Sequence, residues 1–136
     1  MIKLIVGNKG SGKTKAMIEK ANAAAAASKG NVVCIEKGLQ LTYDLSHKVR
    51  LIDVTQYGVK GYEAYCGFIC GVMAGNYDIT DIFCDATLKI GGDDLEAFAD
   101  MVEKLISLTT ANGMEITFTV SCDLSRLPER IKKYVI

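Results

Sequence analysis

Eight consecutive residues near the amino end, Gly7-Asn8-Lys9-Gly10-Ser11-Gly12-Lys13-Thr14, constrain the fold of this chain more than any other stretch. They follow a short apolar run that starts at Ile2, and they lead into residues 13–27, which are rich in Ala and contain neither Pro nor Gly. The apolar run is typical of a buried strand and the Ala-rich segment of a helix. We therefore expect the eight residues to form the turn between a strand and a helix.

The residue types in this turn suit the binding of a polyphosphate. Gly7, Gly10 and Gly12 are free to adopt backbone conformations that turn successive N–H groups inward, which creates an anion-binding concavity. The helix that starts near Lys13 adds unpaired N–H groups and the positive end of its dipole. We expect Lys13 to reach the β- and γ-phosphates and the Thr14 hydroxyl to bind Mg²⁺.

The pattern G-x-x-x-x-G-K-[ST] resembles the Walker A motif of P-loop NTPases. The resemblance covers the first strand, the loop and the first helix closely, and the rest of the chain only as an order of elements. It implies two cofactors, Mg²⁺ and a nucleoside triphosphate such as ATP. The nucleotide-binding residues that it implies are Gly7, Asn8, Lys9, Gly10, Ser11, Gly12, Lys13, Thr14 and Lys15.

Strand-like and helix-like segments alternate along the chain. The expected strands are residues 2–6, 32–35, 49–54, 79–85 and 115–121, and the expected helices are residues 13–27, 61–74, 93–112 and a short one from Pro128 to Tyr134. This alternation predicts an α/β three-layer sandwich, with a mostly parallel five-stranded sheet and helices on both faces. A length of 136 residues suits one domain. With the resemblance, residues 1–136 are expected to form a single nucleotide-binding domain of the P-loop NTPase fold.

Local signals predict where the helices end. Gly30 suits a left-handed residue at the end of the first helix. Asp93, with Glu96 three residues later, resembles a capping box at the start of the helix that ends near residue 112.

Two segments carry weaker signals. The period of the apolar residues places Gly67 and Gly71 on or near the packed side of the helix at 61–74, where a close neighbour would explain them. Residues 37–48 have no helical period, and the expectation there is limited to a short extended piece at 41–43.

A second acidic group is expected at the end of another buried strand. Asp85 follows Ile82-Phe83-Cys84 and resembles the Walker B aspartate, which holds Mg²⁺ or accepts a hydrogen bond from Thr14. Asp81 is the rival, but it precedes the apolar run and so lies at the wrong end of the strand. The metal ligands implied are Thr14 and Asp85.

Hydrolysis also needs a group that activates water. Many ATPases of the additional-strand class carry Glu directly after the Walker B Asp, whereas this chain has Ala86. In recombinase-like members the working Glu comes from the end of the second strand, and Glu36 has that position. The catalytic residues implied are Lys13, Glu36 and Asp85, with the alternative that no base is present and hydrolysis is slow.

Two further features concern the transferred phosphate. Ser121, at the end of the fifth strand, resembles a sensor position that contacts the γ-phosphate or the attacking water; an ordinary strand-end residue is the alternative. Arginines are scarce, so an arginine finger would have to be Arg126 or Arg130, or come from a partner protein or a second copy in a homo-oligomer. Surface solvation is the simpler role for both.

Composition limits the partners and the cellular compartment that we expect for this chain. The 16 basic and 16 acidic residues cancel, so bulk charge indicates neither nucleic acid nor a membrane surface as partner. The amino end lacks the pattern of a secretory signal, and the longest apolar run, residues 67–75, is about half a membrane span. We expect a cytoplasmic protein whose five cysteines are reduced and buried, without a zinc site. These are Cys34, Cys66, Cys70, Cys84 and Cys122.

The leading hypothesis is therefore binding of Mg·ATP with slow or partner-stimulated hydrolysis. The chain resembles small bacterial P-loop ATPases of recombinase-like type and, distantly, pilus-retraction and secretion ATPases, but it lacks the histidine-rich motifs of the latter. One alternative is a kinase for a nucleoside, nucleotide or other small molecule, although no arginine-rich lid and no zinc-binding cysteine pairs of the thymidine kinase type are present. Another is a nucleotide-gated adaptor without turnover, which the lack of Glu after Asp85 favours.

Overall fold

The computed structural model describes residues 1–136 and contains one five-stranded sheet. Its strands are β1 (Ile2–Gly7), β2 (Asn31–Glu36), β3 (Val49–Asp53), β4 (Ile79–Cys84) and β5 (Glu115–Ser121). Every pairing is parallel, and the strand order is β1-β5-β4-β2-β3. The predicted five-stranded sheet is confirmed, with each strand boundary within one residue of the expected position.

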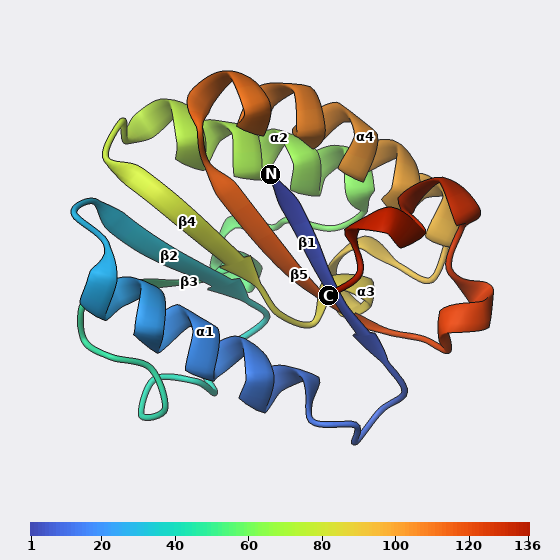
Figure 1. The fold of residues 1–136 in the computed structure, drawn as a ribbon, viewed down its shortest axis with the longest axis horizontal. Coiled ribbons are helices and arrows are strands. Elements are labelled where there is room, and N and C mark those ends of the chain that lie inside the picture. Colours follow the sequence, from blue (N-terminus) through green and yellow to red (C-terminus); the bar gives the residue numbers. More distant parts are fainter.

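Helices cover both faces of the sheet, so the predicted three-layer α/β sandwich is also confirmed (Figure 1). One face carries α1, and the other carries α2 and α4 side by side (Figure 1). The α-helices are α1 (Lys13–Ala27), α2 (Tyr62–Gly75), α3 (Thr87–Gly91) and α4 (Leu95–Asn112). Three short 3-10 helices complete the chain: η1 (Val54–Tyr57), η2 (Leu124–Arg126) and η3 (Glu129–Tyr134).

The sheet separates two hydrophobic clusters, because alternate residues of each strand face opposite sides. In β4, Ile82 and Cys84 belong to the larger cluster under α2 and α4, whereas Phe83 belongs to the smaller cluster under α1. The three central strands, β2, β4 and β5, have buried residues on both faces, as expected for a parallel sheet between helices, whereas the edge strands β1 and β3 are fully buried on one face only. The strands are therefore held by packing on the sheet faces, and the loops that follow them leave from their carboxyl ends.

Residues 37–48 form turns, so the expected extended piece at 41–43 is wrong. The backbone N–H groups of Asp44 and Leu45 both donate to the carbonyl oxygen of Leu41, at 3.0 and 3.1 Å. Leu41 and Leu45 are buried in the smaller cluster. The turns thus bury both leucines in the cluster that also contains Met17 and Ala21 of α1.

The start of α4 differs from the expected capping box by one residue. Asp94, and not Asp93, is the N-cap, and its carboxylate accepts from the N–H groups of Glu96 and Ala97 at 3.1 Å. With Asp94 as the N-cap, Glu96 is one residue too early to close a capping box, and its side chain pairs with Arg130 instead.

The end of α1 also differs from expectation. The helix ends at Ser28 in an extended conformation, and Gly30 is not left-handed. Gly30 serves a different purpose, since a Cβ atom at this position would collide with the carbonyl oxygen of Asp78. The glycine therefore permits close approach of the chain that enters β2 to the chain that enters β4.

The glycines of α2 lie outside the core, which corrects the expectation that they face a packed neighbour. Gly67 and Gly71 are exposed, and a Cβ atom built on either meets no other atom within 4 Å. Their helix is held by its opposite face, where Tyr62, Tyr65 and Ile69 are buried.

The last residues cover the outer edge of the sheet. Val135 forms a parallel bridge with Leu4, and the backbone N–H of Ile136 donates to the carbonyl oxygen of Leu4 at 3.0 Å. Pairing of this kind removes part of an exposed strand edge. The terminal helix predicted from Pro128 is present as η3, with 3-10 geometry.

No helix is both long enough and apolar enough to cross a membrane. The five cysteines are free: Cys34, Cys84 and Cys122 are buried, as predicted, whereas Cys66 and Cys70 are only half-buried.

Candidate functional site

The carboxyl ends of four strands bring the predicted site residues to one edge of the sheet. Cys84, the last residue of β4, pairs with Ile35 of β2 on one side and with Phe118 of β5 on the other. Asp85 therefore emerges between Glu36 and Thr119, which follow those partners in their strands. In open α/β sheets, ligands bind in the crevice outside these strand ends.

The glycine-rich loop joins β1 to α1 at this edge. Gly10 and Gly12 have positive φ angles of 84° and 88°, the left-handed region that favours glycine, as predicted for them. Gly7 does not, which corrects the expectation for this residue: a Cβ atom there would collide with the Ser11 hydroxyl oxygen. Gly12 is the N-cap of α1, so the first N–H groups of that helix face the loop.

Lys13 lies folded into the loop. The side chain is only 9% exposed, and its ammonium group donates to the carbonyl oxygen of Asn8 at 3.0 Å. No carboxylate forms an ion pair with it. An ammonium group has three hydrogens to donate, and lysines this buried are usually paired with an acid. Lys13 is thus a buried cation without an acidic partner in the chain.

Asp85 accepts hydrogen bonds from two threonines. The Thr14 hydroxyl lies 3.2 and 3.4 Å from the two carboxylate oxygens, although the residues are 71 positions apart in sequence. The Thr119 hydroxyl donates to Asp85 at the shorter distance of 2.6 Å. Because Thr14 donates its hydrogen to Asp85, the lone pairs of its oxygen remain available to a cation. Oxygen donors of these kinds are the ligands that Mg²⁺ prefers.

The backbone after Asp85 is strained. Ala86 has a φ angle of 54° and is the only residue other than glycine with a positive φ angle. Its N–H donates to the Thr119 hydroxyl oxygen at 3.2 Å, so this one hydroxyl holds both the Asp85 side chain and the chain that follows. Strained residues cluster at functional sites, where the surrounding structure fixes them.

Glu36 is buried beside Asp85, with 3% of its surface exposed. Burial raises the pKa of its carboxyl group, the hydrogen bond from the Leu41 N–H (3.2 Å) lowers that pKa, and the negative charge of Asp85 raises it again, with a net increase. A carboxyl group whose pKa moves toward neutrality is better suited to act as a general base.

A cleft of about 800 Å³ connects these groups. Of the predicted nucleotide-binding residues, Lys9, Gly10, Lys13 and Thr14 line it, together with Glu36, Asp85 and Ser121. The other loop residues, Gly7, Asn8, Ser11, Gly12 and Lys15, are not part of its wall.

Ser121 is exposed in the cleft and forms no side-chain hydrogen bond, whereas Thr119, which sequence reasoning missed, contacts Asp85. No arginine lines the cleft. Arg130 pairs instead with Asp100 and Glu103 on the surface of α4, at 2.9 and 3.1 Å.

Comparison with protein-family models and with curated proteins finds no match to this chain. The functional argument therefore depends on the geometry of the cleft. That geometry combines a glycine loop with two left-handed residues at the amino end of α1, a buried lysine without an acidic partner, and a threonine–aspartate pair with an adjacent buried carboxyl group.

Proposed function

We propose that the chain binds a nucleoside triphosphate together with Mg²⁺ in this cleft, and hydrolyses it slowly or under stimulation by a partner. The observation that carries the proposal is the contact between the Thr14 hydroxyl and the Asp85 carboxylate, at 3.2 Å. These two residues come from distant parts of the sequence, and an Mg²⁺ site for phosphates needs both on the same side of the loop.

The loop supplies the binding energy for the phosphates. Its amides, the amino end of α1 and the Lys13 ammonium all favour negative charge, and Lys9, Lys37 and Lys89 add cations around the cleft. The chain has no cluster of three or more His, Cys, Asp or Glu side chains that would hold a metal alone. Mg²⁺ would be held by Thr14 and Asp85 with phosphate oxygens and water, its usual coordination in such enzymes, and would offset phosphate charge.

The strand order supports the resemblance to the additional-strand class of ATPases. β5 lies between β1, which carries the loop, and β4, which leads into Asp85. Glu36 has the position expected for the base of recombinase-like members, and its pKa is raised by burial. Since no arginine lines the cleft, fast hydrolysis would need one from a partner or a second copy.

The decisive measurement is thermal unfolding with and without Mg·ATP or Mg·GTP. At about one hundred times the dissociation constant, ligand binding should stabilise the wild type by about 2.7 kcal/mol, which raises Tm by on the order of 10 °C. Lys13→Ala should abolish this increase, whereas Lys20→Ala, an exposed lysine farther along α1, should retain it. Equal melting curves for the wild type with and without nucleotide would refute the proposal.

Phosphate release then separates an enzyme from an adaptor. If Glu36 activates water, Glu36→Gln should bind Mg·ATP with unchanged stabilisation and release phosphate at least tenfold more slowly than the wild type. Asp85→Asn should weaken the binding of Mg·ATP and slow the release of phosphate. If the wild type releases phosphate only at the background rate, the proposal of nucleotide binding stands and the proposal of hydrolysis is refuted.

A further inference from the structure

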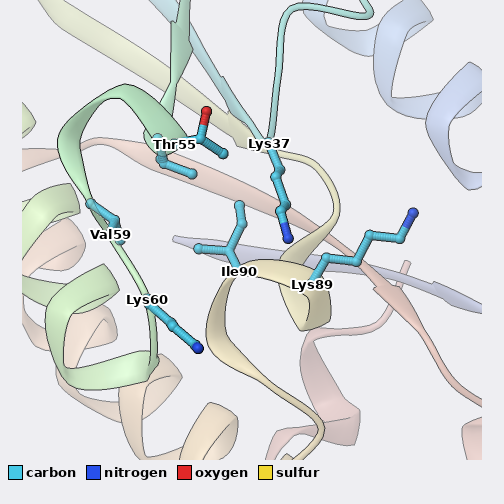
Figure 2. A pocket seen from close by; sticks show the side chains of 7 residues that line it. Lys37, Thr55, Val59, Lys60, Lys89 and Ile90 are labelled. Atoms are coloured by element: carbon cyan, nitrogen blue, oxygen red, sulfur yellow. The ribbon is translucent and has the colours of Figure 1, made fainter.

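A second hollow lies beside the nucleotide cleft, between the loop after β2, the segment before α2 and α3 (Figure 2). Its volume is about 210 Å³. Three lysines, Lys37, Lys60 and Lys89, line it, and no carboxylate does. Figure 2 shows the Lys37 side chain extending toward Ile90, with Lys60 and Lys89 on either side. Three lysines therefore border the hollow, although the ammonium group of Lys89 points away from it in Figure 2.

The Asp53 carboxylate, which lies at this wall, accepts hydrogen bonds from Gly38 and Thr55 and not from a lysine. None of the three lysines forms an ion pair, although the chain as a whole carries no net charge. Like charges gathered around one space repel each other, and an anion between them turns that repulsion into attraction. All three side chains are exposed to solvent, so the attraction should weaken as salt is added.

The backbone fixes the segments that carry the lysines. The N–H of Gly61 donates to the carbonyl oxygen of Ile90 at 3.1 Å, which ties together the residues that directly follow Lys60 and Lys89. On the third side, the Gly38 N–H, directly after Lys37, donates to the Asp53 carboxylate at 2.8 Å. The same carboxylate oxygen accepts from the Thr55 hydroxyl and N–H, which anchors the wall formed by η1. The arrangement is therefore built into the fold.

Size and lining define the ligand. At about 210 Å³ the hollow has about a quarter of the volume of the neighbouring cleft, which limits it to a small ligand. Val54, Val59 and Ile90 provide an apolar wall for a short carbon skeleton. Lysine is a compact point charge without the planar fork of arginine, so it selects for the amount of negative charge and not for one acid group.

We propose that this hollow binds a small dianionic metabolite, a phosphate monoester or dicarboxylate with a short carbon chain, through Lys37, Lys60 and Lys89. Lys37 and Lys89 also line the nucleotide cleft, whereas Lys60 lines only the hollow. A nucleotide in the cleft should therefore change the affinity of the anion. This coupling rests on the proposed function, but the anion site itself does not.

The test is a titration followed by NMR of the Ile and Val methyl groups, at low ionic strength. The probes are inorganic phosphate, glycerol 3-phosphate and succinate, so that the phosphate and carboxylate classes are compared. The methyl signals of Ile90 and Val59 should shift saturably with at least one organic probe. Lys60→Met should weaken that binding at least tenfold, whereas Lys48→Met, an exposed lysine directly before β3, should leave it unchanged.

Absence of saturable shifts, or equal affinity in Lys60→Met and the wild type, would overturn the anion site. So would shifts that vanish in Lys13→Ala and persist in Lys60→Met, because they would report phosphate bound in the glycine loop. The two proposals fail separately. If Mg·ATP does not stabilise the wild type, the nucleotide proposal fails while the titration of Ile90 still decides the anion site.

Discussion

A threonine hydroxyl has one hydrogen to donate, and at Thr119 that hydrogen goes to Asp85. The same oxygen also accepts a hydrogen bond from the N–H of Ala86. Thr119 is therefore the only residue of β5 whose side chain contacts the Asp85 carboxylate and the Ala86 N–H. Thr119 is 3% exposed, and water cannot easily replace either contact. Its role is to position Asp85 toward Thr14.

Replacing Thr119 with Val tests this role. The change keeps the shape, removes the hydroxyl and should lower stability by about 1–3 kcal/mol, because Asp85 and the Ala86 N–H each lose a partner. Affinity for Mg·ATP should fall at least tenfold, measured by calorimetry. Thr119→Ser should recover most of both, and Thr117→Val, buried in the same strand but not bonded to Asp85, should leave affinity unchanged. Normal affinity in Thr119→Val would contradict a positioning role.

The raised pKa of Glu36 predicts how the stability of the fold depends on pH. Since the folded state raises the pKa of its carboxyl group, ionised Glu36 destabilises the fold, and this part of the stability decreases as pH rises above the ordinary value near 4.5. Each unit of increase in pKa corresponds to about 1.4 kcal/mol. Glu36→Gln retains an oxygen that accepts from the Leu41 N–H, so this variant should be more stable than the wild type at pH 7.

The measurement is urea unfolding between pH 4 and 8. The difference between Glu36→Gln and the wild type should shrink as pH falls to about 4.5 and vanish below it. Glu19→Gln, an exposed change on α1, provides the matched control. A difference that does not vary with pH would mean that the charge of Glu36 is not the cause.

At the level of single residues, the sequence predicted the site where a local pattern exists. The spacing of the glycine loop predicted Lys13 and Thr14, and the apolar run before Asp85 predicted a carboxylate at the same edge. Thr119 could not be found in this way. It alternates with buried residues just as Thr117 does, and only the register of β5 against β4 shows which of the two reaches Asp85.

Among the elements, α2 contains two glycines that disfavour a helix and that no contact in the structure requires. Gly67→Ala and Gly71→Ala should each stabilise the protein by about 1 kcal/mol, because alanine favours a helix and the added Cβ meets open space. Gly91→Ala should destabilise it, because the Cβ would collide with the Tyr62 ring, whose hydroxyl donates to the Gly92 carbonyl oxygen at 2.6 Å. Thermal unfolding of the three variants checks the signs.

If Gly67→Ala lowers Tm instead, α2 is bound on its outer face by something that requires the glycine. If Gly91→Ala is neutral, Tyr62 has room to move, and the contact between α2 and the end of α3 is looser than the structure indicates.

The elements also show where prediction from sequence ends. Long periodic segments such as α1 and short apolar runs such as β4 were predicted closely, because burial imposes a pattern on them. α3 has five residues, too few to show a period, and was not predicted. Residues 37–48 were unclear because Leu41 and Leu45 are buried by a turn, which leaves no regular spacing in the sequence.

For the whole molecule, the class of architecture could be predicted and the order of the strands could not. Alternating strands and helices imply a parallel sheet between helices. Strands buried on both faces carry similar apolar runs, so nothing in those runs indicates which strand pairs with which. The insertion of β5 between β1 and β4 is therefore known only from the structure, and it decides that Thr119 meets Asp85.

That insertion also bears on how the protein is made. The ribosome releases β1 and β4 well before residues 115–121, yet these two strands never touch in the finished sheet. Neighbouring strands lie about 4.8 Å apart, so β1 and β4 must stay about two strand spacings apart until β5 is made. If they pair with each other first, that pairing must break before β5 can enter the sheet. The glycine loop and Asp85 are translated before β5, but we expect Asp85 to be held beside Thr14 only once β5, which carries Thr119, lies between β1 and β4. The Thr14–Asp85 pair should thus form only after β5 has been synthesised.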